Sequence, residues 1–224
     1  MLKRLFGEQI CHKMKNKLLL LLVFTLPLLS FAQNEDLQLW GSLKFSKKVN
    51  SKLRFELRDQ IRWADSLSQY KKNFIDIGFR YNLRKAHSFG LNVRIVNEFE
   101  EDKYTRMNFD FSSVHSFKNN PISLKQRLRI QQSWDSMGEL DKTHLRAKWA
   151  IALKSKLINP YISHELYWKM AATNEFNQRR STIGITWSMM DKLKMKLFLR
   201  SQKEFNNKNP DQLHIIGFGV HYKI

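Results

Sequence analysis

Cysteine is nearly missing from this chain of 224 residues, because Cys11 is the only one. It lies in an N-terminal segment that we expect to be removed, so the remaining chain has neither disulfides nor thiol chemistry. Glycine and proline are also scarce, with eight and four residues. No Gly/Ser-rich or Pro-rich linker divides the chain, and we expect one domain over residues 33–224.

Motifs for metal or phosphate binding are missing as well. The seven histidines are scattered without paired ligand spacing, and no Asp-rich calcium loop occurs. A Gly-rich loop that could hold a phosphate group is absent too, because "GFGV" near the C-terminus belongs to an alternating segment. We therefore expect neither a metal nor a cofactor.

Long hydrophobic runs are limited to one, Leu18–Leu29. A cationic stretch at residues 13–17 leads into it, and Ser30–Ala32 supplies the small residues that a signal peptidase accepts. The run is shorter than the roughly 20 apolar residues of a transmembrane helix. We interpret residues 1–32 as a secretory signal peptide, in preference to a retained membrane anchor. Met14 is the expected true start, and residues 1–13 are then an upstream extension. No cysteine follows the cleavage site, so a lipoprotein anchor is not expected.

Negative charge is in short supply, since the chain has a formal net charge of +19. Removal of residues 1–32 takes away five cations and one glutamate, which leaves 34 Lys/Arg against 19 Asp/Glu and a charge of +15. In a cytosolic protein such a charge would suggest nucleic acid as the partner. A secreted chain seldom meets nucleic acid, so we expect no such partner and look for another role.

What the chain has in abundance is period-two alternation of apolar and polar residues. In Leu53–Trp63 the odd positions are apolar except for Asp59, and the even positions are Arg, Glu or Gln. This alternation predicts a β-strand with one apolar and one polar face. Ten further segments show the same period: Leu37–Phe45, Phe74–Leu83, Phe89–Phe99, Thr105–Val114, Ile122–Trp134, Lys142–Leu153, Tyr161–Trp168, Arg179–Met189, Leu193–Gln202 and Leu213–Ile224.

The connections between these segments alternate between short turns such as "RKAHS" and longer polar loops such as "KMAATNEFNQ". That arrangement is typical of an up-and-down antiparallel transmembrane β-barrel, with the short turns in the periplasm. We predict 10–12 strands. Because bacterial single-chain barrels have an even number of strands, the segment Leu37–Phe45 is an extra one. It either pairs at the seam with a missed partner or folds into the lumen.

The positions of aromatic residues favour a lipid-facing apolar row. Five aromatic residues lie near strand ends on the parity of that row, as the girdles of membrane barrels do: Trp63, Trp134, Trp168, Trp187 and Tyr222. Trp149 lies in the middle of a strand and does not support this interpretation. We expect the five to lie at the membrane interfaces.

The opposite row is basic, and closure of the barrel would direct it into one lumen. We expect the following arginines to be its binding residues: Arg54, Arg58, Arg62, Arg94, Arg127, Arg129, Arg146 and Arg200. Two interpretations stay open at this point. The arginines pair with Glu56, Asp76, Glu98 and Asp110 and fill a narrow barrel, or the surplus cations attract small anions along a narrow path.

The C-terminal "GFGVHYKI" resembles the strand by which the assembly machinery of the outer membrane recognises barrels, although it ends in Ile instead of Phe. Together with "FAQ", "LRFELRDQIR", "PYISHELYW" and "RRSTIGITW", it resembles a DUF2490-like family of signal-peptide-bearing barrels from Bacteroidetes-type Gram-negative bacteria. The resemblance implies an outer-membrane location, with outer-membrane lipid, lipopolysaccharide and the barrel assembly machinery as partners. It implies no established activity.

Two other functions compete with this interpretation. A soluble periplasmic barrel that binds an apolar ligand would have the same alternation with the faces reversed. An outer-membrane lipid hydrolase would use a serine and a histidine on the barrel wall, and Ser163 and His164 are adjacent. Neighbouring residues of a strand point to opposite faces, and His144 has no serine partner in its own strand. We therefore predict no catalytic residues.

Overall fold

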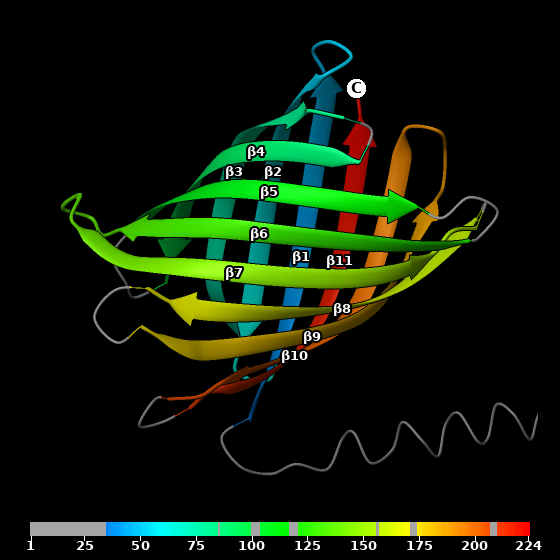
Figure 1. Cartoon of the computed structure of the whole chain (residues 1–224). Coiled ribbons are helices and arrows are strands. Elements are labelled where there is room, and N and C mark those ends of the chain that lie inside the picture. Colours follow the sequence, from blue (N-terminus) through cyan, green and yellow to red (C-terminus); the bar gives the residue numbers. More distant parts are fainter. Residues whose placement is uncertain are drawn as a thin grey trace, which may run out of the picture. The chain divides into compact units, whose positions relative to one another are not determined.

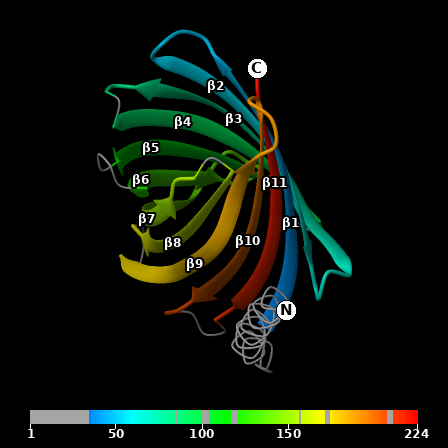
Figure 2. The same ribbon diagram turned by 90° about the vertical axis from the view of Figure 1, so that its right-hand side faces the viewer.

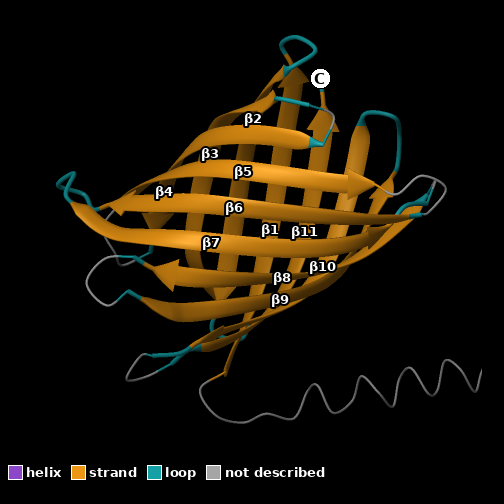
Figure 3. Ribbon diagram, viewed as in Figure 1, coloured by secondary structure: helices purple, strands orange, loops and turns teal. Residues whose placement is uncertain are grey.

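The computed structural model describes residues 35–84, 86–99, 104–116, 121–155, 157–170, 174–206 and 210–224. Every regular element among them is a β-strand, so the predicted all-β fold is confirmed (Figure 3). No helix in this part of the chain is long and apolar enough to cross a membrane. The expected signal peptide, residues 1–32, lies outside the described residues.

Eleven strands follow one another in the described part of the chain, within the predicted range of 10–12. They are β1 (Glu35–Lys48), β2 (Leu53–Ala64), β3 (Gln69–Asn82), β4 (His87–Glu98), β5 (Tyr104–Ser116), β6 (Ile122–Trp134), β7 (Leu140–Leu153), β8 (Ile158–Lys169), β9 (Glu175–Ser188), β10 (Leu193–Glu204) and β11 (Gln212–Lys223). Each strand pairs with the next one along the chain, and β1 and β11 close the barrel (Figure 1).

The closing pair differs from all the others in direction. Every consecutive pair of strands is antiparallel. Ten reversals separate β1 from β11, so these two neighbours run the same way, and Figure 2 shows them side by side. The Ile224 amide donates to the Ser46 carbonyl oxygen at 2.8 Å across this seam. The segment Leu37–Phe45 is therefore part of the wall in β1, between β2 and β11, and the strand number is odd.

The strands are longer than the alternation predicts, because regular pairing continues into residues that read as turns. Each spans 12 to 14 residues. Strand β8 begins at Ile158 and includes Pro160, although "KSKLINP" predicts a turn. We call the end with the connections after β1, β3, β5, β7 and β9 the short-turn end, and the opposite end the long-loop end.

The two faces of the wall are oriented as the aromatic residues predict. Apolar side chains of the odd row of β3 and β4 point outward and are exposed, including Phe79 (51%) and Ile95 (53%). Polar side chains of the opposite row point inward and are buried, including Asp110 on β5 (0%) and Arg129 on β6 (8%). Phe55 and Phe79 form an edge-to-face pair across β2 and β3, with ring centroids 5.4 Å apart. The interior is therefore polar and the outer wall apolar.

Part of the interior near the seam is packed with aromatic and aliphatic side chains. Trp40, Phe198 and Ile215 form a buried cluster that extends over β1, β10 and β11. The ring of Phe198 lies directly over Gly217, where an added Cβ would come within 2.0 Å of the ring. The absence of a side chain at Gly217 therefore makes the room that this ring occupies.

Three irregularities of pairing occur at the long-loop end. They fall between Arg62 and Trp63, between Ser133 and Trp134, and between Tyr167 and Trp168. Each directly precedes the tryptophan near the end of its strand. The extra residue lies on the partner strand in each case, and these residues are Lys71 of β3, Asp141 of β7 and Asn177 of β9. A β-bulge adds local twist and redirects side chains of the bulged strand, so the tryptophans keep the regular alternation of their own strands.

Candidate functional site in the barrel interior

The barrel encloses a cavity of about 1510 Å³. Its lining extends from Asp135 and Asp211 at the long-loop end to Lys194 and His221 at the short-turn end. Nineteen lysines and arginines line it, against nine aspartates and glutamates. The excess of positive charge in a space that spans the length of the barrel makes this cavity the candidate site.

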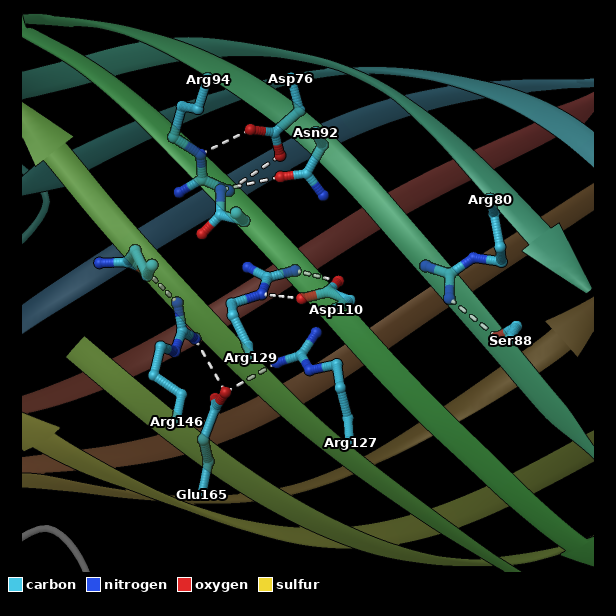
Figure 4. A network of polar contacts seen from close by, with 12 residues as sticks. Asp76, Arg80, Ser88, Asn92, Arg94, Asp110, Arg127, Arg129, Arg146 and Glu165 are labelled. Carbon is cyan, nitrogen blue, oxygen red and sulfur yellow. Dashed lines mark hydrogen bonds and ion pairs between the residues drawn. The ribbon is translucent and has the colours of Figure 1, made fainter. Parts of the chain in front are cut away.

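Carboxylates of β2–β5 each hold cations from neighbouring strands. Asp76 accepts two hydrogen bonds from Arg94, at 2.6 and 2.8 Å, and Asp110 accepts two from Arg129 (Figure 4). A planar guanidinium matches a carboxylate in this two-bond geometry. The remaining ion pairs of this group are Asp76 with Arg58, Glu56 with Lys44 and Arg80, and Glu98 with Lys72.

Glu165 on β8 is the most highly connected carboxylate of the interior. It accepts hydrogen bonds from Arg127 at 2.7 Å and from Arg146 at 2.9 Å (Figure 4), and Arg180 lies 3.7 Å away. Only 4% of its side chain is exposed. Arg146 also donates to Gln131 at 2.6 Å. One buried carboxylate therefore lies next to three cations from β6, β7 and β9, and its single negative charge offsets only part of theirs.

Trp40 provides a second way of holding cations. The guanidinium of Arg62 lies 3.6 Å from the ring centroid, with Arg200 at 5.0 Å and Arg180 at 5.7 Å. The Trp40 indole N–H donates to Gln38 at 2.9 Å, which fixes the ring. Stacking on an aromatic face stabilises a guanidinium without a carboxylate, so arginines from β2, β9 and β10 converge here.

A further group of cations lacks a carboxylate partner, and we call it the cation cluster: Lys125, Lys148, Lys196 and Arg200. None of the four forms a salt bridge within the described part of the chain. Arg200 donates to the Thr182 hydroxyl at 3.0 Å. Lys196 of β10 and Lys125 of β6 line the same cavity, as do Lys148 and Arg200, although β6 and β10 are not neighbours in the wall. The cluster therefore faces one common space.

The structure places most of the predicted arginines on the cavity wall. Seven line it: Arg58, Arg62, Arg94, Arg127, Arg129, Arg146 and Arg200. Arg54 lies opposite Lys48 and Arg80 at the short-turn end and is not among the lining residues. The seven do not form one set, because Arg94, Arg127, Arg129 and Arg146 are bound to carboxylates.

The predicted interface aromatics share the outward parity of the wall. Outward side chains lie opposite each of them: Leu39 opposite Trp63, Thr105 opposite Trp134, Leu145 opposite Trp168, Met195 opposite Trp187 and Leu193 opposite Tyr222. Trp134 and Trp168 lie at the long-loop end, whereas Trp187 and Tyr222 lie at the short-turn end. Their position at a membrane interface stays a prediction.

The adjacent Ser163 and His164 lie on opposite faces of β8. Ser163 points inward and is 4% exposed, whereas His164 points outward. Nδ1 of His164 lies 3.0 Å from the hydroxyl of Ser181 on β9. His144 points inward and contacts the amide of Asn177 at 3.3 Å. No group of three or more metal-ligating side chains occurs among the described residues.

Two residues of the site escaped the sequence analysis. Glu165 has the parity of Ser163 and Tyr167, opposite to Ile162 and Leu166, so the alternation alone could have placed it inward. Trp40 has the parity of Gln38, and both residues line the cavity. The signal for both residues is therefore the alternation of their own strands.

The comparisons with known proteins bear on the family. Residues 37–214 match the family described as a protein of unknown function, DUF2490. The chain belongs to the DUF2490 family. The DUF2490 match covers all of the strands except the start of β1 and most of β11.

Among solved structures, this DUF2490 protein is similar to one titled KdgM porin, at 12% identity and a TM-score of 0.46. The similarity covers 71% of this chain and 81% of that one. No curated protein matches the sequence.

Proposed function

We propose that this protein is a β-barrel of the Gram-negative outer membrane whose interior binds small anions and passes them across the membrane. The cation cluster carries the proposal. Its lysines and arginine lie in a cavity that extends between both ends of the barrel, and they have no carboxylate partners among the described residues. A low-dielectric wall lined by one sign of charge concentrates counter-ions.

The membrane location is supported by the outer wall. Large apolar side chains are exposed on most strands, including Leu128 (51%), Ile183 (60%) and Leu199 (55%). Such a surface would associate in water, whereas lipid covers it without cost. A soluble barrel that binds an apolar ligand requires the opposite orientation, with an apolar interior and a polar outer surface.

Ion selectivity in planar bilayers tests the anion path. Under a KCl gradient, we expect a reversal potential that favours chloride. The variant Lys125→Gln/Lys148→Gln/Lys196→Gln removes three cations of the cluster, and we expect the preference for chloride to fall by roughly tenfold. Substitution of Arg127 or Arg129 would be a less specific test, because each of these arginines forms an ion pair with a carboxylate, which its removal would leave without that partner.

A matched control removes the same charge elsewhere. Lys47, Lys52 and Lys192 are exposed near the short-turn end and do not line the cavity. The triple substitution of these lysines by Gln should leave selectivity unchanged. Equal losses in both variants would mean that net charge, and not the cavity, sets the selectivity. A wild-type protein without any conductance would favour a closed structural barrel, filled by its ion pairs.

Membrane insertion needs its own test. A purified barrel of this kind should require detergent and should migrate differently on gels before and after boiling. A protein that stays soluble without detergent and migrates identically would contradict the proposed location.

A further inference from the structure

The outward face of β8–β11 carries a group of polar side chains where the alternation predicts apolar ones. We call this group the outer patch: His164, Arg179, Ser181, Ser201, Lys203 and His214. Five of the six are exposed, and His214 is half-buried. The anion path does not use these residues, because none of them lines the cavity.

Strand register brings the members of the outer patch together. Arg179 on β9 lies directly opposite Lys203 on β10. Ser181, two residues further along β9, lies between His164 on β8 and Ser201 on β10. His214 on β11 lies opposite Ser201. Directly opposed side chains on one face are about 5 Å apart at Cβ, so the patch consists of two adjacent rows across four strands.

The rows are organised as a binding surface for an anion. His164 and Ser181 are connected at 3.0 Å, which fixes an imidazole beside a hydroxyl. Arg179 and Lys203 form no salt bridge within the described residues, and neither row contains a carboxylate. Two cations with hydroxyl and imidazole groups beneath them offer several donors to one phosphate.

The depth of the outer patch in the membrane is indicated by the neighbouring row of outward side chains. One step toward the short-turn end, the outward residues are all apolar: Ile162, Ile183, Leu199 and Ile216. The patch therefore begins where the apolar belt ends, on the long-loop side. Trp168 and Phe176 flank it there, with ring centroids 4.5 Å apart. Aromatic pairs of this kind mark the headgroup level of a bilayer.

We propose that the outer patch binds the phosphate groups of lipid A, the membrane anchor of lipopolysaccharide. Long loops of outer-membrane barrels face the cell exterior, so the headgroup level beside the patch belongs to the outer leaflet. The phosphates of lipid A would supply the anionic partners that Arg179 and Lys203 do not have among the described residues. Lipid A binding rests on one part of the proposed function, namely that the apolar outer wall faces lipid. It does not depend on the passage of anions through the interior.

Binding of lipid A to the detergent-solubilised protein tests this inference. The probes are diphosphorylated lipid A, the same lipid with its phosphates removed, and phosphatidylglycerol. Binding is followed by the fluorescence of the native tryptophans and by the shift in melting temperature. We expect the diphosphorylated form to bind about tenfold more tightly than either of the others.

The variant Arg179→Gln/Lys203→Gln should lose that tenfold preference. Its matched control, Arg84→Gln/Lys192→Gln, removes one arginine and one lysine at the short-turn end and should bind as the wild type does. Equal affinity of the wild-type protein for the three probes would overturn the inference, whether or not the variant folds. An equal loss in both variants would also overturn it. The double variant at the patch should conduct chloride like the wild type, so failure here is distinguishable from failure of the anion path.

Discussion

The inward side of the barrel is held together in two different ways. On β2–β8, which we call the paired wall, buried carboxylates such as Asp110 and Glu165 bind arginines of adjacent strands. On β9–β11 and β1, which we call the packed wall, carboxylates occur only near the long-loop ends of strands, at Glu175, Glu204 and Asp36. Aromatic rings there take the place of the carboxylates.

The difference shows what a cation-rich interior requires. Arg94 and Arg129 of the paired wall bind carboxylates, whereas Arg200 of the packed wall lies 5.0 Å from the centroid of the Trp40 ring and has no carboxylate partner among the described residues. The cation cluster draws Lys125 and Lys148 from the paired wall and Lys196 and Arg200 from the packed wall. Net positive charge therefore accumulates in the space between the walls, where no carboxylate forms an ion pair with these four cations among the described residues.

The largest effect is expected from breaking the paired wall at its centre. In Glu165→Gln, the cations Arg127, Arg146 and Arg180 lose their shared carboxylate. Removal of one partner from a buried ion pair costs about 3–5 kcal/mol, and we expect a loss of this size in the free energy of unfolding. Guanidinium unfolding in detergent micelles measures it. Glu139→Gln, in the loop after β6, is the control and should change the stability little.

A smaller loss in the free energy of unfolding is expected when a methyl group is added to the packed wall. Gly217→Ala places a Cβ about where the Phe198 ring lies, and overpacking of this kind costs about 1–3 kcal/mol. The matched control on the paired wall is Gly90→Ala, whose Cβ would meet its nearest atom at an ordinary 3.5 Å.

The pair Gly217→Ala/Phe198→Leu should recover part of the loss, because the smaller side chain leaves room for the methyl group. If Gly90→Ala were as costly as Gly217→Ala, the contrast in packing between these two positions would be wrong. The same unfolding measurement covers all three variants.

The smallest effect on stability is expected from the cation cluster itself. Lys125→Gln/Lys148→Gln/Lys196→Gln removes like charges that repel one another, so we expect stabilisation by about 1 kcal/mol or less at low salt. Because salt screens this repulsion, the difference from the wild type should vanish at about 1 M salt. A variant that is destabilised at both salt concentrations would show that these lysines hold the walls together.

Much of the wall follows from the sequence, because alternation fixes both the strands and their faces. In Leu53–Trp63 every arginine of the even row points as predicted, since a strand has only two sides. The choice of face came from the aromatic residues, which is a separate signal. Strand ends were less predictable: Ile158 and Pro160 extend β8 because pairing with β9 overrides their turn-forming character.

The pairing inside the cavity could not be predicted in the same way. Alternation places Arg127 and Lys125 on one face, but only the side-chain contacts show that Glu165 reaches Arg127 and forms no ion pair with Lys125. The bulges before Trp63 and Trp134 are invisible in the sequence as well, because they depend on the partner strand. The outer patch was missed because Arg179 and Ser181 come from one strand and Lys203 from another.

An odd number of crossings has a topological consequence. The start of β1 lies at the long-loop end and the end of β11 lies at the short-turn end, so in the proposed orientation they are on opposite sides of the membrane. In an even-stranded barrel every strand can enter the membrane as one arm of a hairpin. Here one strand has no hairpin partner left. Closure therefore pairs β1 and β11 in the same direction, whereas the first and last strands of an even-stranded barrel meet antiparallel.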